Sequence, residues 1–122
     1  MLDDGGCASG GLEATMHYLN TTRHLITPPS DATIDDLMKL LTEQIVPSAA
    51  TLSGLRSISW LLSHDGMTLQ AFSGWGAAED LSRAEHSDQH VNNGKIINEL
   101  LGGLAGPQEH SYYRLLGERS FE

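Results

Sequence analysis

Residues 55–75 read LRSISWLLSHDGMTLQAFSGW, and this stretch decides the fold. Its two halves are rich in β-branched, aromatic and other apolar residues, and they flank Asp65-Gly66, a dipeptide that favours the tight turn of a β-hairpin. A two-residue turn at Asp65-Gly66 sets Leu62 opposite Leu69, whereas a three-residue turn would mix apolar and polar side chains. We therefore expect a hairpin with one apolar face. Its members are Ile58, Trp60, Leu62, Leu69, Ala71 and Trp75.

The opposite face of the expected hairpin is half polar. It carries Leu61 and Phe72 together with serines and Gln70. Such a face is too apolar to be left in water, and a second copy of the same sheet is the simplest cover. We therefore expect a homodimer that forms through the sheet face.

An amphipathic helix is predicted upstream of the hairpin, because apolar residues recur there every three or four positions. Thr33 is the expected N-cap, with Asp36 in the capping-box position. Pro47 lacks an N–H and disfavours the helical conformation at the residue before it, so we expect the helix to stop or kink there. The apolar stripe consists of Ile34, Leu37, Met38, Leu41 and Ile45.

The remaining elements are less sharply bounded. They are a strand within 14–26, a short helix over 76–85, a helix over 89–104 and a strand over 109–116. Asn92-Asn93-Gly94 indicates fraying or a turn within the second of these helices. The resulting order, β-α-β-β-α-β, predicts an α+β, ferredoxin-like fold with an antiparallel sheet and helices on one face.

Composition limits the classes of partner. The chain has 122 residues and a formal net charge of −9, which disfavours binding to nucleic acid or to anionic membranes. The single cysteine, Cys7, cannot form an internal disulfide, and no apolar run is long enough to span a membrane. We expect a soluble, cytoplasmic protein, with residues 1–12 as a flexible N-terminal tail and 13–122 as one ferredoxin-like domain.

Several short motifs resemble the antibiotic-biosynthesis monooxygenase family. They are LLTEQIVP at 40–47, Ser53-Gly54, FSGW at 72–75 and GAAEDL at 76–81. The resemblance implies a dimeric α+β barrel and cofactor-independent oxidation of a small aromatic or polyketide-like molecule, so we expect no cofactor. A non-catalytic ligand-binding or structural dimer of the same fold is the alternative.

The resemblance also implies where family-specific residues would stand. Polyketide-oxidising members resemble the chain at Trp75, but Ala71 and Leu81 occupy the places of their Asn and Tyr. Haem-degrading members have a Trp and a His where Ala84 and Gly94 stand. Asn20 is a loose match to an Asn of the haem-degrading relatives, and haem binding is therefore a further alternative.

His17 is the candidate catalytic base. A neutral imidazole can remove a phenolic or enolic proton near neutral pH, and on the helix side of the sheet it would join Trp60, Ser73 and Trp75 around a pocket. The alternative is a structural histidine or one on the dimer face. The two tryptophans are either core residues or the walls of a site for a flat ligand.

His86 and His90 complete the candidate substrate-binding residues, with Trp60, Ser73 and Trp75. Their spacing of four would place them on one face of a continuous helix, but two ligands do not make a metal site, and Ser87-Asp88 would break that helix. We therefore expect no metal. Scattered cations could hold an anionic group, although such residues usually lie at the surface. They are Arg23, His24, Arg56 and Arg114.

Overall fold

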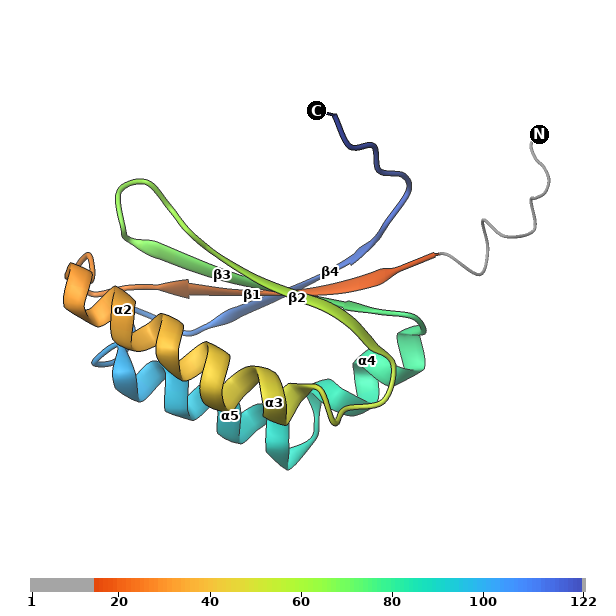
Figure 1. Cartoon of the computed structure of the whole chain (residues 1–122), viewed down its shortest axis with the longest axis horizontal. Helices are drawn as coiled ribbons and strands as arrows, with labels where there is room; N and C mark the ends of the chain where they lie inside the picture. The colour runs from red at the N-terminus through yellow and green to blue at the C-terminus, as the bar shows by residue number, and fades with distance from the viewer. Residues whose placement is uncertain (1–14, 122) are drawn as a thin grey trace.

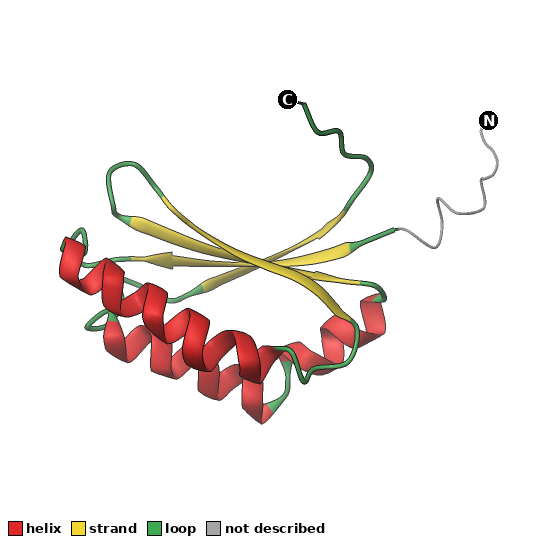
Figure 2. Ribbon diagram, in the orientation of Figure 1, coloured by secondary structure: helices red, strands yellow, loops and turns green. Residues whose placement is uncertain are grey.

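A four-stranded antiparallel sheet carries helices on one face only in the computed structural model, which describes residues 15–121 (Figure 1). The sheet order is β2-β3-β1-β4, and a view coloured by secondary structure separates the helix layer from the sheet (Figure 2). The expected tail, 1–12, lies outside the described residues. The elements are β1 (His17–His24), α2 (Asp31–Leu40), η1 (Leu41–Ile45), α3 (Val46–Ala49), β2 (Leu55–Leu62), β3 (Thr68–Trp75), α4 (Ala78–Glu85), α5 (Asp88–Leu100) and β4 (Glu109–Arg114).

The hairpin of β2 and β3 has the predicted register. Leu62 pairs with Leu69 and Trp60 with Ala71. The connection is looser than a two-residue turn, because the Gly66 N–H donates to the Ser63 carbonyl and the Ser63 N–H donates to the Thr68 carbonyl. Gly66 takes the positive φ of 75°, which explains the glycine there.

Strand β1 lies in the middle of the sheet and alternates as the pattern of its side chains predicts. Leu19, Thr21, Arg23 and Leu25 are all buried, and they alternate with residues on the open face. The strand is shorter than the predicted span of 14–26. Leu25 adds only an isolated bridge to Leu104, so regular pairing of β1 ends at His24.

The first helical segment differs from the prediction at both ends. Ser30, rather than Thr33, is the N-cap, and its Oγ accepts a hydrogen bond of 3.2 Å from the Thr33 N–H. Pro47 does not end the helix, because the chain passes through the π-helical turn η1 and continues as α3. The wider turn accommodates a residue that has no N–H to donate.

Helices α4 and α5 are separated where Ser87 begins the second one. Ser87 Oγ accepts from the His90 N–H and donates to the Ala84 carbonyl, so it satisfies both helix ends. Helix α5 runs through Gly94 without the expected turn or fraying. It ends at Leu100, earlier than predicted, with Gly102 and Gly103 at φ of 80° and 98°.

The core lies between the sheet and the helices in two clusters. The larger one joins β1, β3, α5 and the α2–η1 segment and includes Leu25, Leu41, Leu69 and Ile97. The smaller one joins β1, β3 and α4 through Leu19, Trp75, Leu81 and Ala84. The chain therefore has the predicted α+β, ferredoxin-like architecture. Within residues 15–121, no helix is both long and apolar enough to cross a membrane.

Candidate functional site

A cavity of about 250 Å³ lies between the helix-facing side of the sheet and helix α5. Strands β1, β2 and β3 contribute one wall, and the π turn places Ile45 in another. The polar part of the lining includes Arg23, Glu85, His90, Asn98 and His110. A cavity with an apolar wall and a few convergent polar groups is the usual form of a small-molecule site.

Two tryptophans supply the flat part of the wall. Trp75 is 2% exposed, and its indole N–H donates a hydrogen bond of 2.9 Å to Ser73 Oγ. Trp60 also packs partly against the larger core cluster. Because Trp75 has its polar group satisfied by Ser73, the indole offers an apolar surface in a fixed orientation.

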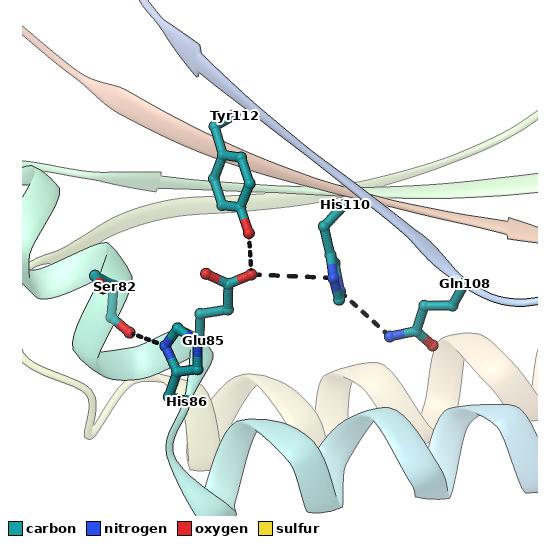
Figure 3. A network of polar contacts seen from close by, with 6 residues as sticks. All are labelled: Ser82, Glu85, His86, Gln108, His110 and Tyr112. Atoms are coloured by element: carbon teal, nitrogen blue, oxygen red, sulfur yellow. Dashed lines mark hydrogen bonds and ion pairs between the residues drawn. The ribbon is translucent and has the colours of Figure 1, made fainter.

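A polar network crosses from helix α4 to strand β4 at the edge of the cavity (Figure 3). Glu85 accepts a hydrogen bond from the Tyr112 hydroxyl, and one of its oxygens lies 3.9 Å from His110 Nδ1. His110 Nε2 lies 3.4 Å from the Gln108 amide. The hydrogen bond from Tyr112 to Glu85 raises the pKa of the Tyr112 phenol. Glu85 is therefore held by two groups of β4.

The same network continues to a buried cation. Gln108 Oε1 accepts a hydrogen bond of 3.2 Å from the Asn98 amide, and Asn98 Oδ1 accepts one of 2.8 Å from Arg23 Nε. Arg23 is 3% exposed, and removal from water lowers its pKa to about 10, so it stays protonated at neutral pH. The cavity thus contains a permanent cation that is positioned by an amide.

His90 is the histidine of α5 that lines the cavity, and it is half-buried. Burial lowers its pKa below the ordinary value of 6.5, and His110 lowers it further. Glu85 opposes this shift, while Arg23 reinforces it. His90 is therefore neutral at pH 7, which is the form that can accept a proton.

The structure brings together four of the predicted site residues. Trp60, Ser73, Trp75 and His90 all line the cavity. His86 is exposed at the end of α4, where its Nδ1 lies 2.8 Å from the Ser82 carbonyl (Figure 3). This places His86 away from the cavity wall.

His17 lies on the helix-facing side of the sheet, opposite Trp75 and Arg114. His17 does not line the cavity, whereas Thr21 of the same strand does. Leu19, a member of the smaller core cluster, lies between these two positions. The role of His17 as a base stays a prediction. Alternation along β1 placed His17 on one face of the sheet, but it indicated neither which face that is nor the position of the cavity along the strand.

Glu85, Asn98 and His110 are cavity residues that the sequence reading did not select. For Arg23 the sequence left two interpretations, a cation that holds an anionic group or a surface residue, and the surface interpretation is wrong because the residue is buried. Its alternation with Leu19, Thr21 and Leu25 was a usable signal for burial. Within residues 15–121, no three His, Cys, Asp or Glu side chains group as metal ligands do.

Comparison with known proteins supports the fold. No family model and no curated protein matches the sequence. Among solved structures, ActVA-Orf6, a monooxygenase of Streptomyces coelicolor in complex with nanaomycin D, has a TM-score of 0.61 and 18% identity, covering 87% of this chain and 92% of that one.

Two other structures are similar to the same degree. Rv0793 from Mycobacterium tuberculosis has a TM-score of 0.59 and 22% identity, covering 86% of this chain and 99% of that one. A dimeric, ferredoxin-like protein of unknown function from Bacteroides fragilis has a TM-score of 0.60 and 18% identity, covering 82% and 96%. The chain therefore has a ferredoxin-like fold, similar to that of a monooxygenase and to that of a dimeric protein of unknown function.

Proposed function

We propose that the protein oxidises a small aromatic molecule with molecular oxygen, without a cofactor, in the cavity between sheet and helices. The observation that carries the proposal is the half-buried His90 in a cavity walled by Trp60 and Trp75, where burial lowers the pKa of the imidazole. A base beside flat apolar surfaces suits a substrate that is itself flat and carries an acidic hydrogen. The fold of ActVA-Orf6, a monooxygenase, supports the same class of reaction.

The reaction begins with proton removal. His90 accepts a proton from an activated methylene or phenol, and the resulting anion is electron-rich enough to pass an electron to oxygen. Combination of the two radicals gives a peroxide on carbon. The O–O bond then breaks as the second hydrogen leaves with hydroxide as water. A methylene and O₂ thus become a carbonyl and water, with oxygen as the oxidant.

Oxygen uptake with a panel of anthrone-like and hydroquinone substrates tests the proposal. We expect uptake by the wild type, and a rate about 10²–10⁴-fold lower for His90→Gln, the usual loss when a general base is removed. His86→Gln is the matched control on the exposed surface. His17→Ala tests the base predicted from the sequence. An unchanged rate in His90→Gln would refute the role of His90, and absent uptake throughout would favour a non-catalytic binding protein.

We further propose that the functional unit is a homodimer formed through the open face of the sheet. Leu61, at 54% exposure, and Tyr113 lie on that face, and Asn20 Oδ1 is buried without a hydrogen-bond partner among the described residues. The segment after β4 leaves the sheet on the side away from the helices, with Leu116 and Phe121 exposed (Figure 1). A second copy would cover these groups.

A further inference from the structure

The buried guanidinium of Arg23 has no carboxylate partner among the described residues. Its Nε donates a hydrogen bond to Asn98, and the four N–H groups on Nη1 and Nη2 have no acceptor within residues 15–121. Buried charges are normally paired, because an uncompensated charge in a dry interior is costly. Within residues 15–121, this buried cation therefore has no counter-ion in contact with it.

The free end of the guanidinium lies at the cavity. Arg23 lines it, and an added Cβ on Gly94, another lining residue, would lie 3.6 Å from Nη2. A side chain at position 94 would narrow the space in front of Nη2.

Glu85, the acid nearest to Arg23 along the polar network, interacts with other residues. Glu85 is engaged by the Tyr112 hydroxyl and by His110, while Asn98 and Gln108 lie between His110 and Arg23. The bond from Asn98 fixes the guanidinium from its Nε side. This arrangement leaves the planar fork of Nη1 and Nη2 for a ligand.

The charge around the cavity has the opposite sign to that of the whole protein. Its permanent charges are one carboxylate, Glu85, and two cations, Arg23 and Lys95, and His90 is neutral. One net positive charge remains at this site in a chain whose net charge is −9. A local excess of this kind attracts a monoanion.

We propose that the cavity binds an aromatic carboxylate, with its carboxylate paired to the Arg23 guanidinium and its ring against Trp60 and Trp75. The inference deepens the proposed function, because it uses the same cavity and names the chemical class of its ligand. An Arg–carboxylate pair forms two parallel hydrogen bonds, which match the two nitrogens left free by Asn98. The lowered pKa of Arg23 supports this, since a bound anion would offset the desolvation of the cation.

A pair of probes of equal shape tests the charge requirement. We would titrate 2-naphthoate and 2-naphthamide into the wild-type protein and follow binding by calorimetry and by the fluorescence of Trp60 and Trp75. The naphthoate should bind at least about 10-fold tighter, because only it forms a charge-assisted pair with the guanidinium. Equal affinities for the two probes would overturn the inference.

Substitutions at and near Arg23 test whether the preference for naphthoate depends on its guanidinium. Asn98→Asp supplies Arg23 with an internal counter-ion at nearly constant shape, so it should abolish the preference for naphthoate over naphthamide. Arg23→Met should do the same if it folds. Arg83→Met is the matched control, since Arg83 is an exposed arginine of α4 paired with Asp80. Loss of the preference in Arg83→Met, or its persistence in Asn98→Asp, would overturn the inference.

The outcome is separable from that of the proposed function. A naphthoate preference that Asn98→Asp abolishes, in a protein with no oxygen uptake, supports the anion site and refutes the oxygenase. Oxygen uptake from neutral anthrone-like substrates, without any naphthoate preference, supports the oxygenase and refutes the anion site.

Discussion

Arg23 Nε donates a hydrogen bond of 2.8 Å to Asn98 Oδ1, and this contact joins the central strand β1 to helix α5. The two residues stand 75 positions apart in the sequence. One is a buried cation and the other presents a neutral amide, so the bond positions the charge without neutralising it. The site therefore depends on how α5 packs against the sheet.

Replacing Asn98 by Ala should destabilise the fold. The substitution leaves a buried donor of Arg23 unsatisfied, which costs about 1–3 kcal/mol. Urea unfolding followed by tryptophan fluorescence measures the loss in the free energy of unfolding. Asn92→Ala, on the exposed side of the same helix, is the control and should change stability by less than about 0.5 kcal/mol. Equal effects of the two substitutions would contradict the structural role of the bond.

His90 should make stability depend on pH on the acid side. Its pKa in the folded protein is below 6.5 because of burial and of His110 and Arg23, with Glu85 opposing. As the pH falls through 6.5, the imidazole of the unfolded chain takes up its proton before that of the folded chain. The free energy of unfolding therefore decreases as the pH falls from 6.5 towards the pKa of His90 in the folded protein.

The measurement is the free energy of unfolding between about pH 7 and pH 5, the range in which an ordinary histidine gains its proton. The wild type should lose stability more steeply than His90→Gln, with His86→Gln following the wild type. Parallel curves for the wild type and His90→Gln would show that the imidazole is not held in its neutral form.

Gly54 is required by its conformation and by its neighbour. It has a φ of 85°, and a Cβ there would lie 2.2 Å from Asp80 Oδ2. Gly54→Ala should therefore cost about 1–3 kcal/mol of stability. Gly106→Ala is the matched control, because nothing lies within 4 Å of its Cβ position. Thermal unfolding should show a lower Tm for the first variant only, and a Tm equal to the wild type would contradict the close packing of the loop on α4.

The open face of the sheet should determine the oligomeric state. Leu61→Lys places a charge where the proposed second copy packs, so light scattering after size exclusion should show a monomer in place of a dimer. Met38→Lys, on the exposed side of α2, introduces the same charge outside that face and should stay dimeric. A wild type that is monomeric at all concentrations would refute the dimer.

The sequence predicted the elements governed by short-range patterns. The hairpin register followed from the alternation of Trp60 and Leu62 with polar residues, and the strand and helix order followed from periodicity. Pro47 was expected to stop or kink the helix, and the first of these is wrong, because the chain passes through a π turn before Pro47 and continues as α3. Propensity alone does not reveal that turn.

The site was predicted less completely. Trp60, Ser73 and Trp75 were found because one face of a hairpin collects them, and His90 because it stands four positions after His86. The pairing of Arg23 with Asn98 was not predictable, since it depends on how far α5 slides along β1. Glu85 and His110 meet for the same reason, across helix and strand. Local sequence patterns predict which face of a strand or helix a residue occupies, whereas tertiary packing determines which residues of different elements come into contact.

Oxidation of an aromatic substrate with oxygen alone is the activity that we propose for this chain. The most direct measurement is the stoichiometry of oxygen consumed and ketone formed by chelator-treated protein with an anthrone-like substrate. We predict one O₂ consumed for each carbonyl formed, no hydrogen peroxide, and a rate that falls in His90→Gln. Oxygen consumption no faster than in protein-free buffer, or consumption that is lost after chelator treatment and restored by a metal ion, would contradict the account.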